Sequence, residues 1–347
     1  MAHTAGNELK GTLPDELGYL TTLTHLSLYA NGIEGPFPDL GDLVDMEFLA
    51  IESNSLTGAV PAWFGNMTSL IYWALGDNQL SGELPEEISE MVRLEEVALD
   101  WNMLTGSVDV FANLAALRRL YLGHNELTGE LDDTFLAGST NLVELDLASN
   151  NFTGTFPVHW INDNTLQIID LHSNLLSGPF PQELERNDQL QFLALYNNDM
   201  EQTIPDAITK LEAVTHLDFS DNAFSGPLPN ALGLMTTLTY LFVANNDFDE
   251  GPIPDLAFLS NLRELSLKGT GRTGGIPPSL GSLTELVLLD LDNNQLVGAI
   301  PDQLGNLGLL RFLLLNRNAL TGIVPLTFTG LDNIGECRYR RLMTGQC

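Results

Sequence analysis

Leucine recurs along the chain at fixed positions, with mostly polar residues between the leucines. The clearest copy, LVLLDLDNN at residues 286–294, has the form L-x-x-L-x-L-x-x-N. Leu289 and Leu291 flank a polar residue, and this alternation with a period of two predicts a short β-strand with one buried face. The other leucines of the copy are expected to point into the same interior.

The pattern returns about every 24 residues from one end of the chain to the other. A fixed period of this length predicts a solenoid, because no single repeat can bury its own leucines and stacked repeats make one continuous core. We expect the asparagine after each strand to bond backbone groups of adjacent turns inside the coil. Thr270 replaces it in one repeat. The marker asparagines are Asn7, Asn31, Asn54, Asn78, Asn102, Asn125, Asn150, Asn174, Asn198, Asn222, Asn246, Asn294 and Asn318.

A glycine and a hydrophobic–proline step follow most markers, as in Gly58-Ala59-Val60-Pro61. Glycine permits a tight turn off the strand, and proline suits a turn or an edge because it has no N–H to donate. With this step the repeat resembles the plant-specific class of leucine-rich repeats over nearly the whole chain. The resemblance implies an α/β repeat fold. This is a right-handed leucine-rich-repeat solenoid with a parallel concave sheet, and with short 3-10 helices, turns and short second strands on the convex side.

We expect a single leucine-rich-repeat domain over residues 1–347. It would contain an incomplete first repeat (1–23), regular repeats (24–325) and a C-terminal cap (326–347). The chain begins inside a repeat and lacks the paired-cysteine cap usual in the plant family. The strand near Leu26 is therefore expected to have an unpaired edge, and we expect the natural product to be longer, with a signal peptide before Met1.

The only two cysteines, Cys337 and Cys347, resemble the disulfide cap of secreted leucine-rich-repeat proteins. A free pair of thiols in a cytosolic protein is the alternative. Asn66-Met67-Thr68 and Asn151-Phe152-Thr153 match the glycosylation motif, so Asn66 and Asn151 are candidate glycosylation sites.

Acidic residues greatly outnumber basic ones: 46 Asp and Glu against 14 Lys and Arg give a net charge of −32. This charge argues against nucleic acid and anionic membrane surfaces as partners. About a quarter of it falls on strand-face positions, which make up about a fifth of the chain, so we interpret the acidity as a global solubility feature. No stretch of 18 apolar residues is present, and we expect no direct membrane insertion by this chain.

No sequence motif of a hydrolase, a metalloenzyme or a phosphate-binding loop is convincing. The glycines of Gly269–Gly274 spell G-x-G-x-x-G, but an ordinary repeat turn follows instead of the helix that phosphate binding needs. Three acids at 247–250 favour a solvated bulge over a Ca²⁺ site, because their spacing matches no calcium loop. The aspartates of the L-D-L strands are interpreted as structural, although paired carboxylates can perform glycosidase chemistry. They are Asp146, Asp170, Asp218 and Asp290.

Aromatic residues on the strand face are better candidates, because exposed rings on a rigid sheet form interaction hot spots and stack on sugars. Arg119, between Glu96 and Glu144 on neighbouring strands, is expected to form a structural ladder of charges. The candidate concave patch consists of His172, Phe192, Tyr196, His216, Tyr240 and Phe242. A second candidate patch consists of Tyr72, Trp101, Tyr121 and His124.

Members of the resembled family are ectodomains of plant receptor kinases, receptor-like proteins and polygalacturonase-inhibiting proteins, with similar arrays in secreted algal proteins. The resemblance implies recognition without catalysis and without a cofactor. We therefore expect an extracellular or cell-surface module whose concave face binds a protein, a peptide or a polysaccharide. A secreted inhibitor of a polygalacturonase-like glycanase and a structural or adhesive matrix protein are the alternatives.

Overall fold

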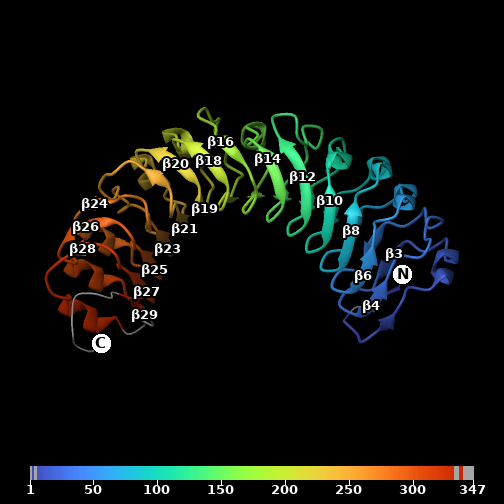
Figure 1. Ribbon diagram of the computed structural model, residues 1–347, viewed down its shortest axis with the longest axis horizontal. Helices are drawn as coiled ribbons and strands as arrows, with labels where there is room; N and C mark the ends of the chain where they lie inside the picture. The colour runs from blue at the N-terminus through green and yellow to red at the C-terminus, as the bar shows by residue number, and fades with distance from the viewer. Residues whose placement is uncertain (1, 4–5, 332–335, 339–347) are drawn as a thin grey trace. The chain divides into compact units, whose positions relative to one another are not determined.

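The computed structural model describes the backbone of residues 2–3, 6–331 and 336–338, and the side chains of residues 6–331. The chain divides into two compact units, Met1–Leu176 and Ser177–Cys347. Both units repeat one plan, in which a strand of a long parallel sheet alternates with a strand of a second sheet, and most turns end in a 3-10 helix (Figure 1). The predicted α/β leucine-rich-repeat solenoid, with parallel sheets and short 3-10 helices, is confirmed.

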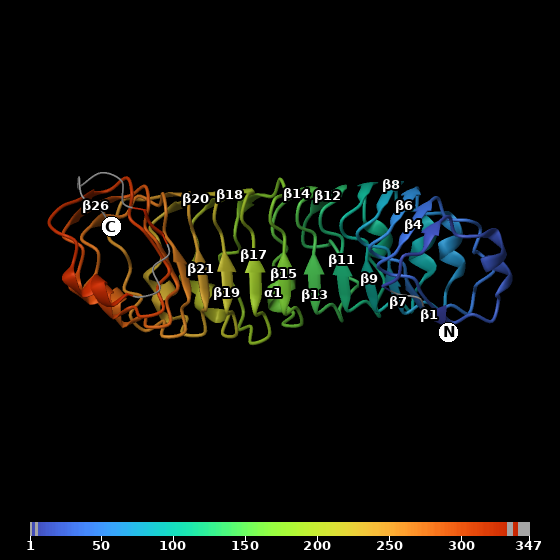
Figure 2. The same ribbon diagram turned by 90° about the horizontal axis from the view of Figure 1, so that it is seen from below.

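The first unit is built on a long sheet whose parallel strands follow one another in chain order. Neighbouring strands pair in register, so that Leu120 lies between Val97 and Leu145. Figure 2 shows these strands side by side along one face of the unit. They are β1 (Ala2–His3), β3 (His25–Ser27), β5 (Phe48–Ala50), β7 (Tyr72–Ala74), β9 (Glu96–Ala98), β11 (Arg119–Tyr121), β13 (Glu144–Asp146) and β15 (Ile168–Asp170).

A second parallel sheet of the same unit pairs the short strands that follow each asparagine marker. Its strands are β2 (Lys10–Gly11), β4 (Gly32–Gly35), β6 (Ser55–Gly58), β8 (Gln79–Glu83), β10 (Met103–Gly106), β12 (Glu126–Leu131) and β14 (Asn151–Gly154). The helices are η1 (Asp15–Tyr19), η2 (Ala62–Asn66), η3 (Glu86–Glu90), η4 (Asp109–Phe111) and the α-helix α1 (His159–Asn162).

The second unit has the same plan, but its second strands form two smaller sheets, β16-β18-β20-β22 and β24-β26-β28. Its long-sheet strands are β17 (Phe192–Ala194), β19 (His216–Asp218), β21 (Tyr240–Phe242), β23 (Glu264–Ser266), β25 (Leu288–Asp290), β27 (Phe312–Leu314) and β29 (Glu336–Arg338). The second strands are β16 (Ser177–Pro179), β18 (Asp199–Gln202), β20 (Ala223–Gly226), β22 (Asp247–Phe248), β24 (Thr273–Gly274), β26 (Gln295–Gly298) and β28 (Ala319–Leu320). The helices are η5 (Asp206–Lys210), η6 (Asn230–Leu234), η7 (Pro278–Ser282), η8 (Asp302–Asn306) and η9 (Leu326–Gly330).

The hydrophobic–proline step explains where the 3-10 helices begin. Pro61 has an extended backbone (φ −73°, ψ 146°) immediately before η2, and its carbonyl accepts the first helical hydrogen bond from Phe64 at 3.1 Å. Proline fixes φ near this value and has no N–H that would remain unpaired there. Pro85 and Pro301 precede η3 and η8 in the same way.

The marker asparagines join successive turns, which confirms their predicted structural role. The Nδ2 of Asn54 donates to the carbonyl of Ile51 in its own turn and to that of Leu28 in the preceding turn, both at 3.1 Å. Its Oδ1 accepts the N–H of Ile33 at 3.0 Å. The same three kinds of bond recur at Asn78, Asn102, Asn125, Asn150, Asn174, Asn222, Asn246, Asn294 and Asn318.

The repeat without an asparagine is held by an arginine instead. Arg272 stands where most other repeats have a buried hydrophobic residue, such as Phe248 or Leu296, and is only 2% exposed. Its guanidinium donates to the carbonyl oxygens of Thr270 (2.6 and 2.9 Å), Asp249 (2.5 Å) and Pro252 (3.3 Å). The guanidinium therefore joins the irregular segment at 249–252 to the turn that follows it. Burial lowers the pKa of Arg272 from its ordinary value.

One local expectation is wrong. The strand containing Leu26 has no free edge, because β1 pairs with β3 in parallel and Leu26 is 2% exposed.

Residues 133–138 form a turn in place of a 3-10 helix. There the Oδ1 of Asp132 accepts both the N–H (2.7 Å) and the hydroxyl (2.6 Å) of Thr134, and such local bonds compete with helix formation.

The predicted disulfide lies outside the described residues, because neither the side chain of Cys337 nor any part of Cys347 is described. The single domain over residues 1–347 stays a prediction. Over the described part of the chain, no helix combines the length and apolar character that a membrane span requires.

Candidate ligand-binding surfaces

Each long-sheet strand, with the two residues that follow it, has three positions that face away from the leucine core. They are its first residue (position 1), its third residue (position 2) and the residue two further on (position 3), which on β7 are Tyr72, Ala74 and Gly76. In-register pairing places the same position of successive strands side by side. The residue after position 3 is position 4, and it has a positive φ in most repeats.

Position 1 carries a ladder of stacked rings in each unit. In the first unit, His25 and Phe48 have ring centroids 5.9 Å apart, and Phe48 and Tyr72 have centroids 4.5 Å apart with planes 8° from parallel. Beside Phe48 and Tyr72, position 2 is Ala50 or Ala74, each at most 2% exposed.

The second-unit ladder consists of Phe192, His216 and Tyr240 on β17, β19 and β21. Ring centroids are 4.5 Å apart for Phe192 and His216, and 4.7 Å apart for His216 and Tyr240, so neighbouring rings cover both faces of His216. Phe242, at position 2, lies beside the ladder with its centroid 6.1 Å from that of His216 and 6.4 Å from that of Tyr240. The structure therefore brings four of the six predicted patch residues into contact.

The other two predicted patch residues lie elsewhere in the repeats. Tyr196 is partly buried at position 3, following β17 in the second unit. His172 belongs to the first unit, where its Nδ1 lies 2.6 Å from the Oδ1 of Asp170. Its ring centroid is 6.2 Å from that of His124, so His172 contacts a member of the second predicted patch.

The four residues of that second patch separate into three settings. Trp101 stacks on His124 with centroids 3.7 Å apart and remains 57% exposed. Burial, followed by the charge of His172, lowers the pKa of His124. Tyr121 donates its hydroxyl hydrogen bond to Glu144, and Tyr72 belongs to the ladder at position 1.

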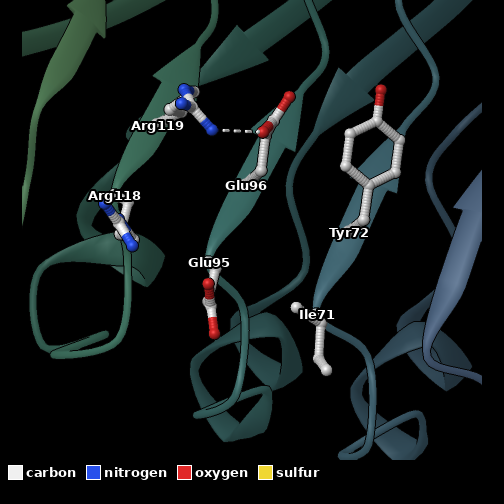
Figure 3. A pocket seen from close by; sticks show the side chains of 6 residues that line it. All are labelled: Ile71, Tyr72, Glu95, Glu96, Arg118 and Arg119. Atoms are coloured by element: carbon white, nitrogen blue, oxygen red, sulfur yellow. Dashed lines mark hydrogen bonds and ion pairs between the residues drawn. The ribbon is translucent and has the colours of Figure 1, made fainter.

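Arg119 forms the predicted ladder of charges. It donates to the Oε2 of Glu96 at 3.0 Å and to the Oε1 of Glu144 at 3.1 Å. Because its side chain is 42% exposed, we expect these pairs to contribute less than about 1 kcal/mol each. A pocket of about 190 Å³ lies beside Arg119 on the same face, and Figure 3 shows the side chains that line it. The pocket is lined by Ile71, Tyr72, Glu95, Glu96, Arg118 and Arg119.

Carboxylates gather near the phenol of Tyr72. Burial, and after it the charges of Glu52, Glu96 and Asp100, raise the pKa of Tyr72 to about 12. Burial also raises the pKa values of Glu52 and Asp100. The Oε2 of Glu52 is buried and accepts no hydrogen bond. Sequence analysis did not single out Glu52, Gly76 and Asp100 as a group, although alignment on the asparagine marker places all three at position 3 of successive strands.

The aspartates of the L-D-L strands have the structural role predicted for them. The Oδ1 of each accepts the N–H of the residue two positions later: at 2.9 Å for Asp146 and Asp218, 3.0 Å for Asp290 and 3.2 Å for Asp170. Burial raises the pKa of Asp146 to about 6. The candidate glycosylation residues Asn66 and Asn151 are both exposed, and both stay predictions.

Comparison with known proteins agrees with this geometry. The profile of the Leucine Rich Repeat family matches residues 141–162, 213–235, 261–283 and 285–307. The chain is built of leucine-rich repeats. The solved structure of the plant peptide hormone receptor RGFR1 in complex with RGF2 is similar to it, with a TM-score of 0.88 and 27% identity over 96% of this chain and 57% of that chain.

A second leucine-rich-repeat structure, the ectodomain of the plant membrane receptor kinase GASSHO1/SCHENGEN3 from Arabidopsis thaliana in complex with CASPARIAN STRIP INTEGRITY FACTOR 2, has a TM-score of 0.82. It is 32% identical, and the match covers 94% of this chain and 42% of that chain. A probable LRR receptor-like serine/threonine-protein kinase of Arabidopsis thaliana is 32% identical over 59 residues, which are 17% of this chain and 6% of that protein. The chain thus spans about half the length of the two solved ectodomain chains.

Proposed function

We propose that this chain is a non-catalytic, extracellular or cell-surface recognition module that binds a peptide or a protein segment on its long-sheet faces. The observation that carries the proposal is the second-unit ladder of Phe192, His216 and Tyr240 with Phe242 beside it. Rings held by a rigid sheet lose little conformational entropy on binding, which suits them as interface anchors. The two similar plant receptor ectodomains, which are solved in complex with RGF2 and with CASPARIAN STRIP INTEGRITY FACTOR 2, support the same kind of ligand.

The orientation of the rings favours a peptide over a polysaccharide. A sugar ring stacks on an open aromatic face, where its C–H groups meet the negative π-surface. In the second-unit ladder both faces of His216 are covered by its neighbours, and Phe192 and Tyr240 each have one face turned to His216. A ligand on this face therefore meets mostly the edges of the rings. Apolar side chains of a peptide can pack against such edges.

The test uses the whole chain against a phage-displayed library of random dodecapeptides, followed by calorimetry with the selected synthetic peptides. We expect selected peptides to bind saturably, and the triple variant Phe192→Ala, Tyr240→Ala, Phe242→Ala to weaken binding at least about tenfold. The control variant carries Leu234→Ala and Phe258→Ala, which remove side chains that are 69% and 65% exposed outside the ladder. Circular dichroism of each variant verifies that the fold is intact.

Unchanged affinity in the triple variant would overturn the assignment of the second-unit ladder. Saturable binding of oligogalacturonides that is lost in the triple variant would assign a polysaccharide ligand instead. Inhibition of a polygalacturonase would assign the inhibitor function, and self-association without a saturable ligand would assign a matrix function.

A further inference from the structure

Trp101 stands at a position that other repeats fill mostly with small polar residues. It occupies position 4 with φ at 54°, a backbone region that costs a bulky side chain energy. Because Trp101 is 57% exposed, the free energy gained by burying its side chain does not offset this cost. Other occupants of position 4 include Ser53, Asp77, Ser149, Ser173, Asn197, Asp221, Asn245 and Asn293.

One face of the exposed Trp101 indole is covered by another aromatic ring, and no ring of the described residues covers the other face. His124 of the following turn stacks on one face. The opposite face turns to the preceding turn, whose position 4 is Asp77. The backbone of Asp77 is fixed there, because its N–H donates to the carbonyl oxygen of Asp100 at 2.9 Å. An indole face is thus available beside a carboxylate.

Gly76, at position 3 of the preceding turn, lies under the carboxylate of Asp100. A Cβ on Gly76 would lie 2.8 Å from the Oδ1 of Asp100, so the Asp100 carboxylate extends over the glycine. Glu52 occupies position 3 on the other side of Gly76. Because strands are about 4.8 Å apart, the backbones that carry Glu52 and Asp100 are about 10 Å apart, and the carboxylate of Asp100 lies over the glycine between them.

Negative charge at this place is not compensated by the protein. Within the described residues, none of Glu52, Asp77 and Asp100 forms an ion pair. The Oε2 of Glu52 is buried without a hydrogen-bond partner, which is unfavourable for an ionised carboxylate. Over the same part of the chain, no group of acidic residues, histidines or cysteines converges closely enough to hold a metal ion. These observations favour an organic cation.

We propose that Trp101, Asp100 and Glu52, with Gly76 under the Asp100 carboxylate and Asp77 and Tyr72 at the rim, form a binding site for an arginine side chain of a peptide ligand. A guanidinium is planar, stacks on an indole face and donates to two carboxylates at once. The site rests on the proposed function in taking a peptide as ligand, but it lies in the first unit and uses none of the ladder residues of the second.

The probe is the peptide acetyl-Gly-Gly-Arg-Gly-Gly-amide, titrated into the whole chain by calorimetry and NMR at low salt. Its partner is the same peptide with citrulline, which has nearly the shape of arginine but no charge. We expect saturable binding of the arginine peptide with a Kd below about 1 mM, and at least about tenfold weaker binding of the citrulline peptide. Trp101→Ala and Asp100→Asn should each weaken arginine binding at least about fivefold.

Gly76→Ala is the sharpest variant, because it keeps every charge and displaces the Asp100 carboxylate with one methyl group. It should weaken arginine binding like Asp100→Asn. Asp221→Asn in the second unit is the matched control, since it removes one acid from position 4 and should leave affinity unchanged. Equal binding of the citrulline peptide, equal losses in Asp221→Asn, or no saturation up to about 10 mM peptide would each overturn the site. None of these results bears on the library-selected peptides that test the ladder.

Discussion

Most marker asparagines join two turns through a single amide, and the repeat at Thr270 shows what is needed when that amide is missing. The hydroxyl of Thr270 donates to Leu267 of its own turn at 2.7 Å, and its N–H is taken by Asn294 of the following turn. Arg272 then supplies donors to the segment at 249–252. A buried guanidinium is tolerated there because three carbonyl groups accept its hydrogen bonds.

Arg272→Ala should therefore destabilise the protein strongly. It would leave a cavity and deprive the carbonyls of Asp249 and Pro252 of their side-chain donor, and we expect a loss of about 3 kcal/mol or more in the free energy of unfolding. Chemical denaturation measures this loss. Arg263→Ala is the matched control, because Arg263 is exposed on the strand face and should change stability by less than about 0.5 kcal/mol. Equal effects of the two substitutions would contradict the assigned role.

Asp146 should make stability depend on pH. Its folded-state pKa of about 6 lies above the ordinary value of 3.8, so the folded protein holds this proton more tightly than the unfolded chain does. The stabilisation is complete below about pH 4 and is lost as pH rises through about 6. Asp146→Asn cannot ionise and keeps an oxygen for the N–H of Ala148.

The substitution should raise the free energy of unfolding at pH 8 by on the order of 2 kcal/mol relative to the wild type, with little change at pH 4. Urea denaturation at the two pH values measures the difference. If Asp146→Asn raises the free energy of unfolding equally at both pH values, or lowers it at pH 8, ionisation of the Asp146 carboxyl does not destabilise the folded protein.

At the scale of the elements, proline and glycine place the 3-10 helices. Proline starts them, and a glycine inside several of them lets the next turn approach closely. A Cβ on Gly281 in η7 would lie 2.3 Å from the carbonyl oxygen of Gln303 in η8, and one on Gly65 in η2 would lie 2.4 Å from that of Glu87 in η3. The spacing between successive 3-10 helices therefore depends on these glycines. They are needed for the missing Cβ and not for a positive φ.

Gly281→Ala should push η7 and η8 apart and lower the free energy of unfolding by about 1–3 kcal/mol, as overpacking against backbone does. Gly308→Ala provides the control, because a Cβ at Gly308 would meet nothing within 4 Å. Thermal unfolding of both variants measures the effect. If Gly281→Ala is as stable as Gly308→Ala, the close approach of the helices is not needed.

The elements were predictable from sequence where one residue type decides the outcome. Leucine spacing and the asparagine marker fix the strands and their register, and the proline step fixes most of the 3-10 helices. The turn at 133–138 depends instead on local hydrogen bonds that Thr134 donates to Asp132, and the repeat pattern does not predict them. In the candidate site, the repeat phase placed Phe192, His216 and Tyr240 in one row. It did not give the ring orientations, nor the carboxylate of Asp100 over Gly76, because these depend on side-chain rotamers.

At the scale of the whole molecule, the net charge of −32 is the dominant electrostatic feature. Few acids are paired: within the described residues the lysines and arginines that form ion pairs are Arg119 and Arg186. Charges of one sign repel one another in the folded state and keep the protein soluble. The proposed arginine site would draw on this field as well as on its own carboxylates.

Added salt should therefore stabilise the folded protein. Between about 20 mM and 0.5 M sodium chloride the Debye length falls to a few Å, and we expect Tm to rise by about 2–5 °C. Calorimetry at constant pH measures the change. A falling Tm would mean that attractive pairs such as Arg119 with Glu96 outweigh the repulsion.

The marker asparagines make the folded protein sensitive to deamidation. Hydrolysis of one such amide to a carboxylate would replace two donated hydrogen bonds with a negative charge facing carbonyl oxygens. Since most of these amides bond carbonyl groups of their own turn and of the turn before it, a single deamidation inside the coil would loosen two repeats at once. Damage would then begin inside the protein. Because hydrolysis of the amide requires water, a dry, well-packed core protects the asparagines from deamidation.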